Sequence, residues 1–187
     1  ASGNPLILEK FKVENELKQL YLSKQRYDKS RDDLGQRIRN YLPTQLKESK
    51  DFLNCLEIDV RDIVDLSGEN FTMQLNGREF NTRTSASEML YKLFSTLTTE
   101  KKVIGNISGF DVVGYKDELW LKPRIYLKNN GEYSVDISNE QEIGNILKME
   151  NILKGLPKRI EEEKDSIQYF EKELEDAKNE FDKPFAQ

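Results

Sequence analysis

The sequence contains no histidine and only one cysteine, Cys55, among its 187 residues. The absence of histidine excludes a His-dependent acid–base site and a Ser-His-Asp triad, and it removes a common ligand of zinc sites. One cysteine cannot form a disulfide within the chain. We expect Cys55 to be a buried structural thiol, because it lies in an apolar helical stripe with no histidine to activate it.

Long apolar runs are also missing from the sequence. No segment approaches the roughly 18–20 apolar residues that a membrane-spanning helix needs, and no signal-peptide pattern is present. We therefore expect a cytoplasmic protein, or a fragment of one, that has no membrane partner. The chain begins Ala-Ser-Gly-Asn without a methionine, which favours a fragment.

Charged residues are abundant by comparison. They make up 34% of the chain against 36% for the apolar class, and the net charge is −5. Together with nine Phe and eight Tyr, this composition indicates long solvated helices around a modest core. A negative net charge is not that of a strongly basic nucleic-acid module, although it leaves a local basic patch open.

Apolar residues repeat at alternating spacings of four and three in two segments at opposite ends of the chain. The first segment runs from Val13 to Tyr41 and the second from Met149 to Phe181. This spacing keeps one side of each helix turned toward a partner helix. We therefore predict an antiparallel coiled-coil hairpin; the alternative is two amphipathic helices that pack separately on a globular core.

The register of the predicted hairpin follows from its charged seam positions. Placing Val13 opposite Phe181 also places Arg31 opposite Glu163, so that each buried charge has a partner. A shift by one heptad would set both charges against apolar residues. We therefore predict that Arg31 and Glu163 mark the coiled-coil register.

The middle of the chain shows the patterns of a small antiparallel sheet with helices against it. Residues 71–75 alternate in polarity and precede Asn76-Gly77, a strong hairpin signal. A helix is predicted from about residue 84, capped by Ser85 with Glu88. Further strands are predicted at residues 78–80, 103–107, 110–115, 119–127 and 133–137. The fold class is therefore α+β, a long antiparallel coiled-coil hairpin with a small α+β domain inserted at its tip.

Two prolines, Pro43 and Pro157, fall near the junctions of the predicted parts and fit a new helix or a kink. They give a first coiled-coil arm at residues 1–42 and a second at 157–187. Residues 43–156 form the inserted α+β domain with its flanking helices.

Motifs for catalysis, cofactors or metals are not found. Three glycines in the strand region, Gly105, Gly109 and Gly114, match no phosphate-binding fingerprint, and we expect turns or bulges there. The aspartates at positions 59, 62 and 65 share a helical face but lack the glycine and closing glutamate of a calcium loop. We predict no catalytic, cofactor-binding or metal-binding residue, and no enzyme activity in this chain.

Basic and aromatic residues are interleaved in the predicted sheet domain. Cations next to aromatic rings can contact phosphates and stack on bases, and on a strand Lys122 and Arg124 would share one face. The alternative is a polar outer face over an apolar inner one. The candidate nucleic-acid contacts are Lys101, Lys102, Lys116, Trp120, Lys122, Arg124 and Lys128.

Segments spread over most of the chain carry a resemblance to a known family. They are residues 2–7 with 9–10, Tyr27 with Ser30-Arg31, residues 71–77, residues 107–110, and the stretches 151–157 and 183–185. These segments resemble the C-terminal accessory region of large superfamily-two, Swi/Snf-like helicases of bacterial mobile elements, which are often fused to an adenine-specific DNA methyltransferase. The motor and methyltransferase motifs of such proteins would precede residue 1, so the resemblance transfers no catalytic residue.

Two hypotheses follow for the function. The first is a non-catalytic accessory domain of a DNA helicase or methylase-helicase, which positions DNA or a partner relative to a motor in cis. The second is a protein-interaction or dimerisation coiled-coil module that makes no DNA contact and forms a homo-oligomer. Neither hypothesis requires a cofactor in this chain.

Overall fold

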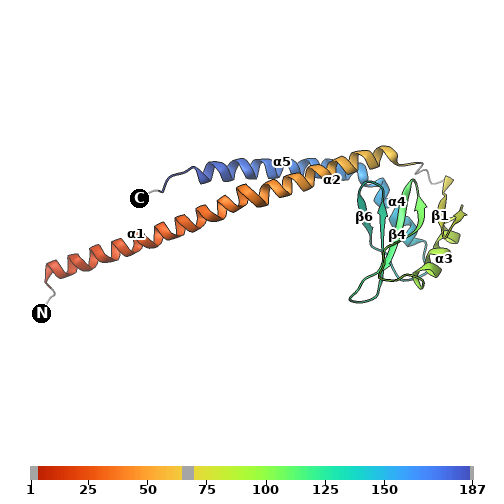
Figure 1. Ribbon diagram of the computed structural model, residues 1–187, viewed down its shortest axis with the longest axis horizontal. Coiled ribbons are helices and arrows are strands. Elements are labelled where there is room, and N and C mark those ends of the chain that lie inside the picture. The colour runs from red at the N-terminus through yellow and green to blue at the C-terminus, as the bar shows by residue number, and fades with distance from the viewer. Residues whose placement is uncertain (1–3, 65–69, 186–187) are drawn as a thin grey trace. The chain divides into compact units, whose positions relative to one another are not determined.

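The computed structural model describes residues 4–64 and 70–185 of the chain. It confirms the predicted α+β class, with a long helical hairpin and a small six-stranded antiparallel sheet. The chain divides into two compact units (Figure 1). The helical unit comprises Ala1–Ser49 and Ser166–Gln187, and the sheet unit comprises Lys50–Asp165.

One nearly continuous helix forms the first half of the hairpin. Helix α1 (Pro5–Gln36) begins at Asn4, whose side-chain oxygen accepts a hydrogen bond of 3.0 Å from the Leu6 amide. It passes through a π-helical turn, η1 (Arg37–Tyr41), into α2 (Leu42–Asp62). Pro43 therefore does not end the helix. Pro43 follows the π-helical turn. Because proline has no amide proton, it cannot donate the usual helical hydrogen bond, and the helix changes its hydrogen-bond pattern just before it.

Helix α5 (Leu156–Phe181) runs antiparallel to α1 within the helical unit. The Tyr27 hydroxyl donates a 2.8 Å hydrogen bond to the Lys183 carbonyl, and the Arg31 guanidinium lies 4.5 Å from the centre of the Phe181 ring. Farther along, Arg37 pairs with Glu173 at 3.4 Å.

These contacts show that the predicted register is wrong, because Arg31 rather than Val13 lies opposite Phe181. Arg31 therefore does not face Glu163. The prediction assumed a buried charge that needs a carboxylate, whereas Arg31 is exposed and stacks on an aromatic ring instead. The observed register sets Gly35 opposite Ala177, and both residues are buried.

A consequence of this register is that the start of α1 has no helix opposite it within the described part of the helical unit. From Tyr27 back to Pro5, α1 extends roughly 33 Å at 1.5 Å per residue. Its large apolar side chains are exposed there: Leu6 by 72%, Phe11 by 67% and Leu17 by 60%. Figure 1 shows α1 running past the end of α5.

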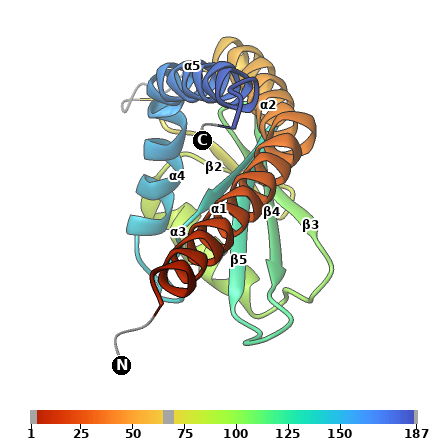
Figure 2. The same ribbon diagram turned by 90° about the vertical axis from the view of Figure 1, so that its left-hand side faces the viewer.

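The sheet has the strand order β2-β1-β3-β4-β5-β6, and every pair of neighbouring strands is antiparallel (Figures 1 and 2). The predicted hairpin at Asn76-Gly77 is confirmed, because both residues have positive φ angles of 51° and 74°. The strands are β1 (Met73–Leu75), β2 (Arg78–Phe80), β3 (Lys102–Ile107), β4 (Phe110–Lys116), β5 (Pro123–Lys128) and β6 (Glu132–Val135).

Two of the strand-region glycines have the turn or bulge role that the sequence predicts. The pairing of β3 with β4 shifts between Val103 and Gly105, which marks a bulge. A Cβ atom at position 105 would overlap the Gln74 carbonyl oxygen, so only glycine fits. Gly109 has a φ of 90° in the turn between β3 and β4. Gly114 instead lies inside β4, where a side chain would press on Leu97.

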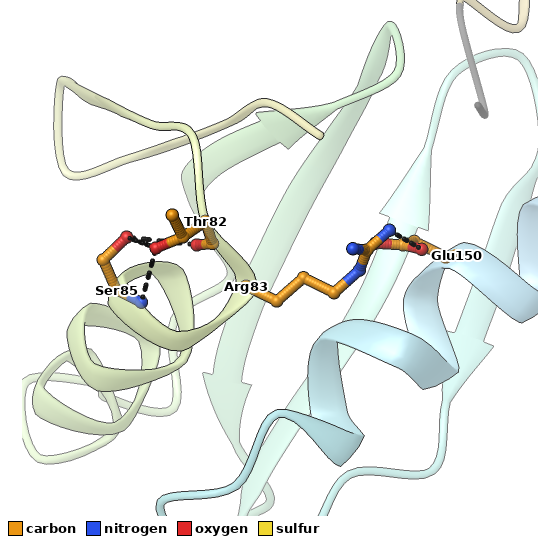
Figure 3. Close-up of polar contacts among 4 residues, drawn as sticks. All are labelled: Thr82, Arg83, Ser85 and Glu150. Carbon is orange, nitrogen blue, oxygen red and sulfur yellow. Dashed lines mark hydrogen bonds and ion pairs between the residues drawn. The ribbon is translucent and has the colours of Figure 1, made fainter. Parts of the chain in front are cut away.

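Helices α3 (Arg83–Phe94) and α4 (Gly144–Lys154) pack against the sheet. The N-cap of α3 is Thr82 rather than Ser85, since the Ser85 amide donates a 3.2 Å hydrogen bond to the Thr82 hydroxyl oxygen (Figure 3). The next residue, Arg83, forms a two-bond pair with the buried Glu150 of α4, at 2.8 and 3.0 Å. This pair links the two helices.

The hydrophobic core lies on one face of the sheet. Leu56 of α2, Leu90 of α3 and Met149 of α4 join the inward side chains of all strands from β1 to β6 except β2 in one buried cluster. Val113 and Tyr126 are also buried but are not part of this cluster. They pair across β4 and β5 and lie on the opposite face, which we call the open face.

The aspartate repeat of α2 serves the fold of the sheet unit. Asp59 is fully buried and accepts hydrogen bonds from the amides of Asn130 and Gly131, from the Asn130 side chain and from the Tyr133 hydroxyl, at 2.6–3.0 Å. Asp62 accepts one from Asn129 at 3.1 Å. Burial, followed by the bond to Asp59, raises the pKa of Tyr133 far above its usual range. The third aspartate, at position 65, lies outside the described residues.

Candidate nucleic-acid interface

Six of the seven candidate residues meet at one end of the sheet. Lys102 pairs with Gly114, and Lys116 pairs with Pro123, so the start of β3, the end of β4 and the start of β5 are neighbours. We call this the cationic end; its members are Lys101, Lys102, Lys116, Trp120, Lys122 and Arg124. With the acidic residues of the same segments, 100–102 and 116–124, it carries five cationic and three acidic side chains.

The seventh candidate, Lys128, lies at the other end of the sheet. It pairs with Asp111 across β4 and β5, and its ammonium lies 4.0 Å from the Glu132 carboxylate. Its charge is therefore surrounded by acids, and Lys128 is separated from Arg124 by four residues, or about 13 Å of strand. Lys128 is away from the cationic end, but it lines one hollow of the sheet together with Lys101, and Asp111 and Glu132 line the same hollow.

Lys101 places a charge on the aromatic part of the open face. Its ammonium lies 5.6 Å from the centre of the Tyr115 ring and 5.4 Å from that of Tyr126. Arg124 is the strand partner of Tyr115 and so shares this face. A hollow of about 650 Å³ runs along the open face from Lys101 past Val113 and Tyr126 to Lys128, where the acidic residues Asp111 and Glu132 also line it. Cations and rings thus alternate on one surface of the sheet.

Lys102 and Lys116 belong to the other side of the sheet. Residues alternate between the two faces along a strand. Val103 and Tyr115 lie on the open face, so the adjacent residues Lys102 and Lys116 point toward the helices. Lys116 lines a second hollow there together with Tyr91 and Lys92 of α3. The cationic end therefore wraps around the end of the sheet rather than covering one face.

The loop between β4 and β5, residues 117–122, projects at this end of the sheet (Figures 1 and 2) and is called the hairpin tip. It exposes three large apolar side chains in a row: Leu119 by 87%, Trp120 by 74% and Leu121 by 60%. The prediction that Lys122 and Arg124 share a strand face is wrong, because β5 begins only at Pro123. Leu121 has a φ of 52°, so the chain turns sharply there instead of extending.

Asp117 fixes the conformation of the hairpin tip. Its carboxylate accepts a 2.5 Å hydrogen bond from the Trp120 amide, and its carbonyl accepts one of 3.0 Å from the Leu121 amide. Its other carboxylate oxygen lies 3.3 Å from the Arg124 guanidinium. The bond from the Trp120 amide, aided by the charge of Arg124, holds the pKa of Asp117 below its usual range. The apolar side chains are thus exposed on a turn with a defined shape.

Sequence reasoning missed Tyr91 and Lys92, which the fold brings to the cationic end. Both lie in the last turns of α3, about 25 residues before Lys116 in the chain. Only the packing of α3 on the sheet makes them neighbours of the hairpin tip. The sequence carried no local signal for this contact.

Other kinds of site find no support in the described ranges. No group of three or more His, Cys, Asp or Glu residues is arranged to hold a metal ion in residues 4–64 and 70–185. Among the same residues, no helix combines the length and the apolar character that a membrane crossing needs. Cys55 is half-buried and unpaired with any other cysteine.

Comparison with protein-family models, curated proteins and solved structures finds no match to this chain.

Proposed function

We propose that this chain is a non-catalytic accessory domain of a DNA helicase or methylase-helicase, and that it contacts DNA through the cationic end of its sheet unit. The observation that carries the proposal is the position of Lys101 over two tyrosine rings, at the same end of the sheet as the exposed Trp120. When lysines bind phosphates, counterions leave the DNA, and this release favours binding. Aromatic rings stack on bases.

The resemblance noted in the sequence supplies the helicase part of the proposal. A motor in cis would carry out ATP hydrolysis, while this chain would hold DNA or a partner in position. The net charge of −5 opposes contact by the molecule as a whole, so binding is confined to the cationic end. The expected affinity is modest and falls as salt concentration rises.

The test is DNA binding by a charge-reversed pair and a matched control. Lys101→Glu with Lys122→Glu changes the cationic end, whereas Lys172→Glu with Lys178→Glu makes the same change in net charge on exposed positions of α5. We expect the first pair to weaken binding of a labelled oligonucleotide at low salt and to flatten the salt dependence. The control pair should bind nearly as the unaltered chain does.

Two results would contradict the proposal. One is the absence of DNA binding by the unaltered chain at about 50 mM salt, where phosphate contacts are strongest. The other is equal weakening by both charge-reversed pairs, since that would mean a general effect of net charge. Circular dichroism and a melting curve for each variant would exclude loss of folding as the cause.

A second candidate function is self-association through the start of α1. The observation that favours it is a stripe of exposed apolar residues on one face of α1, formed by Leu6, Val13, Leu17 and Leu20. Ile7, Leu8 and Phe11 are exposed outside this face. Burying such a stripe against a second copy would remove it from water. Light scattering should then show a mass that rises with concentration, and Leu17→Lys with Leu20→Lys should restore the monomer. A monomer at all concentrations would rule this function out.

A further inference from the structure

A hollow of about 470 Å³ lies where the C-terminal turn of α3 meets the hairpin tip. Tyr91, Lys92 and Ser95 line it from the α3 side, and Lys116 and Leu121 line it from the hairpin side. It lies on the helix-covered side of the sheet and is distinct from the hollow of the open face. It is also large enough for one nucleotide, since ligand pockets begin at roughly 300 Å³.

The side chains around this hollow match the two parts of a nucleotide. Lys92 and Lys116 supply a positive charge from each side, as a phosphate requires. Tyr91, which is 43% exposed, offers a ring and Leu121 offers an aliphatic surface for a base. Trp120 is adjacent to Leu121 in the chain, and its 74% exposure leaves the indole available to a neighbouring base.

We propose that this hollow and the hairpin tip bind single-stranded DNA. One nucleotide enters the hollow with its phosphate between Lys92 and Lys116, and an adjacent base stacks on Trp120. This inference rests on the proposed DNA contact and names the form of DNA that the contact selects.

Single strands are selected because stacking needs a free base face. In a duplex each base is already covered on both sides by its neighbours, whereas an unpaired base offers its face to a ring. The tip is also ordered before binding, through the bonds that Asp117 makes to the amides of Trp120 and Leu121. Little conformational freedom is therefore lost when a base stacks there.

Trp120 is the single tryptophan of the chain, so its fluorescence reports on the tip alone. We expect titration with an oligothymidylate of roughly 12 nucleotides to quench this emission, and a duplex of equal length to quench it much less. The affinity for each DNA follows in parallel from the anisotropy of a labelled strand. Vesicles of anionic phospholipid serve as the probe for membrane insertion.

Three variants separate stacking from charge. Trp120→Ala should weaken single-strand binding roughly 5- to 150-fold, the cost of one lost stacked base, while Trp120→Phe should recover part of the loss. Lys92→Gln with Lys116→Gln should flatten the salt dependence for single strands by about 0.7, the value for one phosphate contact, because the two lysines hold the same phosphate. Duplex binding should fall by a smaller factor than single-strand binding in all of them, because Lys101 and Lys122 are unchanged.

The outcomes distinguish this inference from the function it rests on. If the chain binds duplex and single strand equally and Trp120→Ala changes neither, the single-strand inference is wrong although the DNA contact stands. If neither DNA binds, both proposals fail. A blue shift of the emission with vesicles, without any change with DNA, would assign the tip to a membrane surface and overturn the inference.

Discussion

Single carboxylates determine how the polar parts of the sheet unit are arranged. Asp59 and Asp117 each accept hydrogen bonds from the backbone of a loop, Asp59 from the turn between β5 and β6 and Asp117 from its own hairpin tip. Asp59 is fully buried, whereas the side chain of Asp117 is 19% exposed. Protonation of Asp117 is therefore easier to measure than protonation of Asp59.

Acid should release the hairpin tip. Because the pKa of Asp117 is lower in the folded chain than in an unfolded one, its carboxylate stabilises the fold above the unfolded value of about 3.9. That contribution is lost as the pH falls through the lower, folded value. We expect the amide proton of Trp120, followed by NMR, to shift with a midpoint below about 3.9.

The control for this titration is Asp117→Asn, which keeps the shape of the side chain but removes its charge. In this variant the Trp120 amide should lose the shift at acidic pH. A midpoint at or above the ordinary aspartate value in the unaltered chain would show that the carboxylate does not hold the tip.

At the scale of helices and strands, the sequence predicts those features that depend on residues close together in the chain. The Asn76-Gly77 hairpin was predictable because both residues adopt positive φ at little cost, and the heptads reveal two long helices. The register between those helices was not predictable, because a pattern that repeats every seven residues fits several registers. The observed register is marked by the contacts of Arg31 with Phe181 and of Arg37 with Glu173, which the heptad spacing does not reveal.

The candidate site shows the same division. Lys116, Trp120, Lys122 and Arg124 are neighbours in sequence, so a hairpin was enough to bring them together. Tyr91 and Lys92 reach the same place only through the packing of α3 on the sheet. Lys128 was grouped with the others because basic and aromatic residues are interleaved in this part of the sequence, but the length of β5 separates it from Arg124.

The observed register can be tested at Ala177, which is 6% exposed. Ala177→Leu adds three carbons at a buried position of α5, and we expect it to lower the free energy of unfolding by about 1–3 kcal/mol. Asn179→Leu, at an exposed position two residues on, should change it by less than about 0.5 kcal/mol. Urea denaturation measures both values. Equal effects would show that Ala177 does not lie between the helices.

Over the whole chain, stability should vary along the continuous helix from Pro5 to Asp62. Its first turns bury none of their side chains, whereas Leu42, Leu46 and Leu56 are at most 9% exposed. A helix without tertiary contacts is only marginally stable in water, because packing of an apolar face supplies most of its stability. The two ends of this helix should therefore open with different free energies.

Hydrogen exchange measures this difference directly. We expect the amide protons of residues 8–21 to be only weakly protected against exchange. Those of residues 46–60 should exchange several orders of magnitude more slowly. Uniform protection along the helix in a dilute sample would contradict the expectation. If protection of residues 8–21 rises with protein concentration and falls in Leu17→Lys with Leu20→Lys, a second copy covers the exposed stripe, because only an intermolecular contact depends on concentration.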